Sequence, residues 1–275
     1  MLYLSQKVYY LRRRTYLKKN LTHTLTELNY KQKWTEGLSH EIEFWHDWIH
    51  TQGQGFGEDF RNRLDPQKPL QEHIWPLLDH LPSGRLRVLD VGAGPLTALG
   101  KIYRSQPLDI VAVDPLADYY DQILREAQLE APVRTTWCHG ELLEDRFEPS
   151  TFDLVFSQNA LDHSYDPYRI IKSMIRLTKV DHFVLLEHRQ NEAERAQYQG
   201  LHQWNFAVEQ GDFVIWNPTS KLNVSKELLP YVDIQIRFIA EVNWLNIQMK
   251  KLKDLPFESD SISSPKRGFW TKLRN

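Results

Sequence analysis

The stretch VLDVGAGPLTALG at residues 88–100 decides the fold. An apolar strand runs into Asp90, Gly92 and Gly94 follow, and the pattern beyond them predicts a helix over 95–103. Because glycine has no Cβ, the backbone can turn tightly here and approach a ligand closely. The amino end of the following helix would lie next to that ligand. The segment therefore predicts a ligand site at the end of the strand, although dinucleotide-binding folds also carry Gly-x-Gly at this place.

A second strand ends in a carboxylate at a fitting distance from the glycines. The segment IVAVD at 110–114 finishes at Asp114, 20 residues beyond Gly94. A carboxylate at this place can accept hydrogen bonds from two ribose hydroxyls. The alternative is an acidic residue that only ends a strand, but the two features in register favour a ribose site.

Strand and helix patterns then alternate to about residue 187. Strands are predicted over 87–91, 109–113, 133–138, 152–157 and 182–187, with helices over 95–103, 117–130 and 168–177. This alternation implies a parallel sheet with helices on both faces. Later segments predict a helix over 191–208, a short apolar run at 213–216 and an antiparallel strand pair at 232–240 and 244–249.

These patterns divide the chain into three parts. An N-terminal helical extension or cap spans 1–82, a ligand-binding domain with a substrate insert at about 189–230 spans 83–252, and a flexible tail spans 253–275. Helices are expected over 38–50 and 69–81 in the extension. The basic segment 1–35 predicts a surface helix, and peripheral contact with an anionic membrane is its second interpretation.

Bulk properties exclude several classes of protein. A net charge of −2 gives no general case for nucleic-acid binding. Cys138 is the single cysteine, which excludes an internal disulfide and a zinc site built from several cysteines. No apolar run approaches the roughly 20 residues of a membrane-spanning helix, and no signal peptide is apparent, so a cytoplasmic protein is expected.

Residues 87 to about 190 resemble class I S-adenosylmethionine-dependent methyltransferases. The resemblance rests on the two segments above, on HGEL at 139–142 and on FDLVFSQNALDHSYDPYRII at 152–171, in family order. The last segment is similar to the loop after the fourth strand in small-molecule methyltransferase domains. The resemblance implies an α/β, doubly wound, seven-stranded and mostly parallel Rossmann-like sheet. The strand pair near the C-terminus is similar to the antiparallel end of that sheet.

The resemblance also implies a cofactor site for S-adenosylmethionine in the loops after four strands. Asp90 and the glycine backbone would hold the methionine part, Asp114 the ribose, and Glu141 the adenine amino group. A glutamate here departs from the commoner aspartate. The implied site comprises Asp90, Gly92, Ala93, Gly94, Asp114, Pro115, Leu116, Glu141, Leu142, Gln158, Asn159 and Ala160.

Three histidines are candidates for a catalytic base. Methyl transfer is a direct displacement, and a hydroxyl acceptor benefits from a base whose pKa is near neutrality. His163 lies in the loop after the fourth strand, His188 ends the fifth strand, and His202 lies in the aromatic segment GLHQWNF. For each, the alternative is a histidine that only orders its surroundings. Glu187, Arg189 and Glu192 are weaker candidates for substrate contact.

The N-terminal extension carries two further patterns. In HDWIH, His46 and His50 have a zinc-like spacing, but no third ligand is evident, so no metal site is predicted. The glycines at 53–57 follow a helix and fail the context of a phosphate loop. We expect residues 38–65 to cap the cofactor, with Trp45 or Trp48 contacting substrate.

The predicted function is methyl transfer from S-adenosylmethionine to a small-molecule, sugar or lipid-like acceptor, at oxygen. One alternative is an NAD-dependent oxidoreductase, which predicts a third glycine where Pro95 to Thr97 follow Gly94. The other is a non-catalytic cofactor-binding scaffold. Methylation of nucleic-acid bases is disfavoured, since the chain has SQNA at 157–160 in place of an Asn/Asp-Pro-Pro-Tyr motif.

Overall fold

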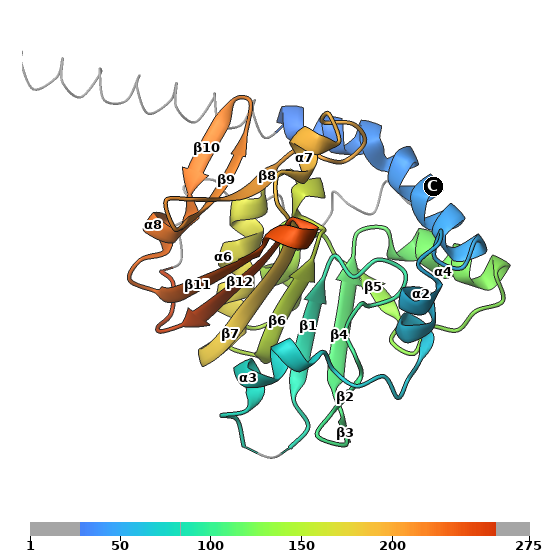
Figure 1. The fold of residues 1–275 in the computed structure, drawn as a ribbon, viewed down its shortest axis with the longest axis horizontal. Helices are drawn as coiled ribbons and strands as arrows, with labels where there is room; N and C mark the ends of the chain where they lie inside the picture. Colours follow the sequence, from blue (N-terminus) through green and yellow to red (C-terminus); the bar gives the residue numbers. More distant parts are fainter. Residues whose placement is uncertain (1–27, 83, 257–275) are drawn as a thin grey trace, which may run out of the picture.

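The computed structural model describes residues 28–82 and 84–256, and a seven-stranded sheet lies at its centre (Figure 1). The strand order is β11-β12-β7-β6-β1-β4-β5. Five neighbouring strands are parallel: β1 (Arg87–Val91), β4 (Asp109–Asp114), β5 (Thr135–Trp137), β6 (Phe152–Gln158) and β7 (Thr178–Arg189). Strand β12 (Trp244–Lys251) is antiparallel to β7 and to β11 (Val232–Ile239). The expected doubly wound, mostly parallel sheet is confirmed.

Helices and short strands surround this sheet. The helices are one over residues 28–50, α2 (Gly57–Leu64), α3 (Trp75–Leu78), α4 (Ala117–Glu126), α5 (Leu143–Arg146), α6 (Pro167–Leu177), α7 (Glu192–Arg195) and α8 (Val224–Leu228). Single 3-10 turns are η1 (Glu72–Ile74), η2 (Gly140–Leu142), η3 (Leu161–His163) and η4 (Ala240–Val242). No helix in the described ranges is long and apolar enough to cross a membrane.

Each face of the sheet carries its own apolar layer, because successive side chains of a strand point to opposite sides. On β1, Val88 packs in the layer that includes Leu77 of α3. Its neighbour Leu89 packs in the opposite layer with Ile171 of α6. Both β1 residues are fully buried, so the continuous apolar run of this strand reflects cover on both faces.

The order of the strands places the ligand site. From β1 the chain moves outward through β4 to β5 and then crosses back to β6 on the other side of β1. In doubly wound sheets, ligands bind beyond the carboxyl ends of the strands where this direction reverses. Figure 1 shows the helix of residues 28–50, in blue, passing over that end of the sheet.

The helix predicted over 95–103 does not form, and this prediction was wrong. Residues 95–101 are bends and irregular backbone, followed by the short strands β2 (Ile102–Tyr103) and β3 (Gln106–Pro107). The Thr97 hydroxyl donates to Asp90 at 2.5 Å and accepts from the Leu99 N–H at 3.1 Å, so it competes with helical bonding. The backbone of Gly100 also lies too close to Pro69 for a side chain at that position.

The helix predicted over 191–208 was also wrong. Only α7 is helical there, and the chain continues into a three-stranded antiparallel sheet of β8 (Asn205–Glu209), β9 (Asp212–Asn217) and β10 (Ser220–Asn223). Gln197 and Tyr198 have positive φ angles of 54° and 57°, which a continuing right-handed helix does not allow. The segment at about 189–230, predicted to be a substrate insert, therefore contains three short strands and two short helices in place of one long helix.

The N-terminal helix is longer than the predicted 38–50. Its apolar side, with Leu38 and Ile42, packs against Ile123 and Leu124 of α4. Gly37 lies against the backbone of Gly200, so the helix also touches the insert. The predicted basic surface helix at 1–35 and the tail at 253–275 lie mostly outside the described residues.

Candidate active site

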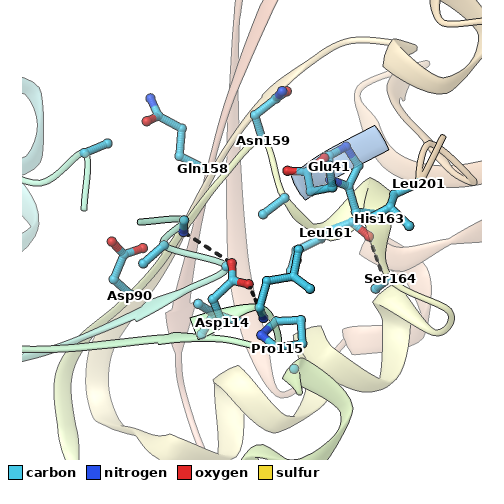
Figure 2. A pocket seen from close by; sticks show the side chains of 18 of the residues that line it. Glu41, Asp90, Asp114, Pro115, Gln158, Asn159, Leu161, His163, Ser164 and Leu201 are labelled. Atoms are coloured by element: carbon cyan, nitrogen blue, oxygen red, sulfur yellow. Dashed lines mark hydrogen bonds and ion pairs between the residues drawn. The ribbon is translucent and has the colours of Figure 1, made fainter. Parts of the chain in front are cut away.

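A cavity of about 590 Å³ opens at the carboxyl ends of the parallel strands, beneath the helix of residues 28–50 (Figure 2). Asp90 and Asp114 lie at one side of it, and Glu41 and His163 lie at the other. The residues predicted for the cofactor all line this cavity except Leu142: Asp90, Gly92, Ala93, Gly94, Asp114, Pro115, Leu116, Glu141, Gln158, Asn159 and Ala160. Sequence motifs far apart in the chain thus meet in one place.

The glycine loop has the conformation that its sequence requires. Gly92 and Gly94 have φ angles of 73° and 65°, in the left-handed region. A Cβ at Gly92 would collide with the Ala160 side chain. A Cβ at Gly94 would come within 2.8 Å of the Trp45 indole. Glycine is needed at both places for backbone conformation and for space.

The two aspartates that follow β1 and β4 are buried. The Asp114 carboxylate accepts hydrogen bonds from the backbone N–H groups of Leu116 at 2.9 Å and Gly94 at 3.2 Å. Burial raises the pKa of Asp114 to about 7, despite these hydrogen bonds. Burial also raises the pKa of Asp90 to about 6, although its bond from Thr97 opposes the shift. The charges of Arg63 and Lys101 also oppose the shift of Asp90, and both carboxylates can accept hydrogen bonds from a ligand.

Glu141 occupies the corresponding place after β5. It is 4% exposed and accepts hydrogen bonds from the backbone N–H groups of Tyr165 and Asp166, at 3.0 and 3.2 Å. Burial raises its pKa to about 7. These bonds tie the loop after β6 to the loop after β5, so Glu141 has a structural task besides any ligand contact.

Asn159 is fixed between two strand ends. Its backbone N–H donates to the Glu187 carbonyl at 2.8 Å, and its side-chain oxygen accepts from the Arg189 N–H at 3.1 Å. The residue has a φ of 47°, which asparagine tolerates better than most residues. Gln158, Asn159 and Ala160 therefore form a fixed floor of the cavity.

The candidate histidines gather around one buried carboxylate, Asp162, which is fully buried. Asp162 accepts at Oδ1 from His188 Nε2 at 3.0 Å and at Oδ2 from His202 Nδ1 at 2.6 Å. His163 Nε2 lies 3.1 Å from His202 Nδ1 and 3.6 Å from Asp162 Oδ2. We call Asp162, His163, His188 and His202 the Asp162 cluster. His163 and His202 line the cavity, whereas His188 is 2% exposed and does not.

The residues of the Asp162 cluster shift one another's pKa values. Burial by itself disfavours the ionised form of Asp162, but the charges of His163 and His188 and the hydrogen bonds from His188 and His202 together outweigh it. The pKa of Asp162 therefore lies well below its ordinary value, and the carboxylate stays ionised. For His202, burial has the largest single effect and lowers the pKa, but the hydrogen bond to Asp162 and the nearby carboxylate charges together outweigh it, so the net pKa is raised.

Sequence reasoning missed two residues of this region. Glu41, on the N-terminal helix, accepts from Trp45 Nε1 at 2.8 Å and places Oε2 3.5 Å from His163 Nδ1. Asp162 stood in the quoted loop beside His163 but was not singled out. The i,i+4 spacing of Glu41 and Trp45 was a usable signal, whereas the contact of Glu41 with His163 joins segments too distant in sequence to be predicted.

Some of the weaker candidates for substrate contact line the cavity, and others do not. Arg189, Glu192 and Trp45 line the cavity. Glu187 instead accepts hydrogen bonds from His73 and Asn246, at 2.8 and 2.9 Å, away from the cavity lining. The indole of Trp48 is buried against Phe60.

Two groups of side chains bear on metal binding. Asp162, His163 and His202 each offer a ligand atom, and these atoms lie within 4.8 Å of one another, the spacing of a site that could hold a metal ion. His46 and His50, whose spacing drew attention in the sequence, are exposed and stack on each other with ring centroids 4.1 Å apart.

Comparison with known proteins matches residues 88–181 to a methyltransferase domain family. No curated protein matches the chain. This segment runs from β1 to the start of β7 and contains the glycine loop, Asp114 and the loop after β6.

Similar solved structures include a phosphoethanolamine N-methyltransferase of Haemonchus contortus in complex with S-adenosyl-L-methionine. It is 16% identical, with a TM-score of 0.48, over 76% of this chain and 56% of that chain. A putative methyltransferase of Haloferax volcanii, in complex with the Trm112 methyltransferase activator, is 13% identical over 79% of this chain and 98% of that chain, with a TM-score of 0.44. A protein of Pyrococcus horikoshii OT3 is 15% identical over 66% of this chain and 88% of that chain, with a TM-score of 0.40. Similarity this distant says nothing of the acceptor.

The family match covers the segment whose strand ends build the cavity. The observed strand order, with an antiparallel end beside β7, is the one that the sequence resemblance implied. Residues 88–181 therefore form a methyltransferase domain, and its strands belong to a seven-stranded, mostly parallel Rossmann-like sheet.

Proposed function

We propose that this methyltransferase transfers the methyl group to a hydroxyl oxygen of a small-molecule, sugar or lipid-like acceptor. The observation that carries the proposal is the Asp162 cluster, in which a buried, ionised carboxylate holds His202 at the cavity wall beside His163. A hydroxyl group must lose its proton during transfer, and positioned histidine and carboxylate groups assist that loss. An acceptor carboxylate is already ionised and would need no such cluster.

We place the cofactor along the glycine loop, because the residues there fit it. Gly92 and Gly94 expose backbone where a Cβ would collide with Ala160 or Trp45, so a ligand can approach the main chain closely. Asp114 ends β4 with a buried carboxylate that suits two ribose hydroxyls. Asp90 of β1 also has a buried carboxylate, which suits the methionine part as a hydrogen-bond acceptor.

S-adenosylmethionine supplies an electrophilic methyl group, whose bonding electron pair stays on sulfur as the acceptor oxygen forms the new bond. The protein's own contribution is to hold the acceptor oxygen in line and to favour loss of its proton. Gln158 to Ala160 form the floor between the two ends of the cavity, and His163 and His202 face it from the acceptor side.

The acceptor end of the cavity favours a polar acceptor. Arg189 and Glu192 line it together with Trp244. Glu192 is 8% exposed, and its Oε2 atom forms ion pairs with Arg189 Nε at 3.4 Å and Arg195 Nε at 3.5 Å but accepts no hydrogen bond from the described part of the protein. A buried carboxylate oxygen of this kind is stabilised by a hydroxyl donor, and an aromatic ring beside it suits the apolar face of a sugar or a similar small molecule.

The test is to identify the atom that is methylated. The protein is incubated with S-adenosylmethionine carrying an isotope-labelled methyl group and with panels of hydroxyl, amine, thiol and carboxylate acceptors, and the products are analysed by NMR and mass spectrometry. We expect labelled methyl ethers, and His202→Ala should abolish them. His80→Ala should not, because His80 is exposed and lies at the opposite end of the strands, beside Asp181. Labelled N-methyl products alone would contradict the proposal.

A further inference from the structure

We propose that Asp162, His163 and His202 bind a divalent transition-metal cation at the acceptor end of the cavity. The inference rests on the proposed function only for the task of the cation, which would be to bind the acceptor oxygen. The site itself rests on the convergence of three ligand atoms, Asp162 Oδ2, His163 Nε2 and His202 Nδ1. The sequence alone predicted no metal site, because its only visible histidine pair was His46 and His50.

The three atoms form a triangle of the size that a small cation requires. Its sides are 2.6 Å from Asp162 to His202, 3.1 Å between the histidines, and 3.6 Å from Asp162 to His163. With metal–ligand distances of about 2.0–2.2 Å, neighbouring ligand atoms lie roughly 2.9–3.5 Å apart. Movements of a few tenths of an ångström would bring all three sides into this range.

Hydrogen bonding alone does not satisfy this triangle. His202 Nδ1 can carry one proton, and that proton serves the 2.6 Å hydrogen bond to Asp162 Oδ2. His163 Nε2 lies 3.1 Å from His202 Nδ1. Without a proton, His163 Nε2 must share the proton of His202; with a proton, its N–H points at another N–H donor. A cation between the three atoms removes the conflict, because each atom then offers a lone pair.

The side chains around the triangle hold its ligands in place. The second oxygen of Asp162 accepts from His188 Nε2 at 3.0 Å, and His188 Nδ1 lies 2.9 Å from the Arg189 carbonyl. The second nitrogen of His163 lies 3.5 Å from Glu41 Oε2. Carboxylate and carbonyl partners of this kind orient metal-binding histidines and raise their basicity.

The local charge favours a cation. Two carboxylates lie at the triangle, because Asp162 supplies one of its atoms and Glu41 Oε2 lies 3.5 Å from His163 Nδ1. Two imidazoles with one carboxylate suit manganese(II), iron(II), cobalt(II), nickel(II) or zinc(II) better than calcium or magnesium. His163 and His202 line the cavity, so positions of the cation not taken by protein would face the acceptor. A hydroxyl bound there has a lowered pKa and releases its proton to solvent water.

The binding test uses the metal alone. The full chain is freed of metal with a chelator and titrated with cobalt(II), whose visible absorption reports on nitrogen and oxygen ligands, and zinc(II) and manganese(II) follow by mass spectrometry of bound metal. We expect one saturable equivalent in the wild type. His163→Gln and His202→Ala should each weaken it roughly 100-fold or more. Circular dichroism and S-adenosylhomocysteine binding confirm that each variant is folded.

The double variant His46→Ala/His50→Ala is the matched control, because it removes two exposed histidines and leaves the triangle intact. It should bind as the wild type does. The proposal is overturned if the wild type shows no saturable binding, if binding survives both His163→Gln and His202→Ala, or if the control variant loses it.

Catalytic assays separate this inference from the proposed function. Methyl ethers that form equally well with and without a chelator would refute the metal site and leave O-methylation standing. Stoichiometric cobalt binding that depends on His163 and His202, in a protein that forms only N-methyl products, would keep the site and refute O-methylation. Chelator-sensitive ether formation that is restored by added metal would support both.

Discussion

The two ends of the cavity, which we propose hold the cofactor and the acceptor, are built in different ways. The cofactor end is made from consecutive strand ends within residues 88–160, and much of it is backbone shaped by glycines. The acceptor end is made from side chains of Glu41, Asp162 with His163, Arg189 with Glu192, His202 and Trp244, which are brought together only by the fold. A cofactor site can therefore be recognised from local sequence, whereas an acceptor site depends on tertiary structure.

The two ends also differ in charge. At the cofactor end, burial raises the pKa values of Asp90, Asp114 and Glu141, because its effect exceeds that of the hydrogen bonds and charges that oppose it. At the acceptor end, histidines hold the pKa of Asp162 well below its ordinary value. The first three carboxylates are poised to accept hydrogen bonds from a ligand, whereas Asp162 is already committed to the protein's own side chains.

The largest effect should come from the acceptor end. We expect His163→Ala or His202→Ala to lower turnover by roughly 10²–10⁴-fold, the usual contribution of a group that assists proton loss. Affinity for S-adenosylmethionine should stay within about twofold of the wild type, since neither residue belongs to the glycine loop. Steady-state kinetics measures turnover, and calorimetry on the same samples measures affinity for S-adenosylmethionine. If cofactor affinity fell with turnover, the two ends would not be separable.

Asp114→Ala should have the next largest effect, on binding. Charge-assisted hydrogen bonds to two ribose hydroxyls contribute about 3–5 kcal/mol together, so S-adenosylmethionine affinity should fall by roughly 100-fold or more. Calorimetric titration with S-adenosylmethionine, S-adenosylhomocysteine and NAD measures this. Asp109→Ala is the control, because that partly exposed carboxylate lies on the same strand at its far end. Near-normal binding by Asp114→Ala would show that the ribose site is placed wrongly.

The accuracy of the sequence predictions follows this division. The parallel sheet was predictable because each strand and its following loop is a local pattern. The helix expected over 95–103 failed because Thr97 bonds to Asp90, and the one over 191–208 failed because positive φ angles end α7 early. The contact of Glu41 with His163 joins the N-terminal helix to η3, and no local pattern specifies it.

Gly94→Ala tests the backbone part of the cofactor end, with a smaller effect. An alanine at a φ of 65° costs about 1–2 kcal/mol, and its Cβ would press on the Trp45 indole. We expect the free energy of unfolding in urea to fall by about 1–3 kcal/mol, with weaker cofactor binding. Gly84→Ala is the control, because its Cβ would meet nothing within 4 Å. Equal stability of the two variants would contradict the tight fit of the loop around Trp45.

The smallest effect should be a pH dependence confined to the cofactor end. Burial raises the pKa of Asp114 to about 7. The ionised form, which would accept the ribose hydrogen bonds, is therefore replaced by the protonated form as the pH falls through that value. If binding needs the ionised form, affinity should drop about tenfold between pH 8 and pH 6. Calorimetry across this range, on the wild type and on Asp114→Asn, isolates the contribution of Asp114, because Asp90 and Glu141 also titrate nearby.

The same shift has an opposite consequence for the protein without ligand. Because the folded pKa of Asp114 is above its ordinary value of 3.8, ionising this residue destabilises the empty domain as the pH rises toward about 7. Asp114→Asn should therefore unfold at a higher denaturant concentration than the wild type near pH 8 and bind the cofactor more weakly. A variant that lost both stability and affinity would show that Asp114 serves the fold through Gly94 and Leu116 more than it serves the ligand.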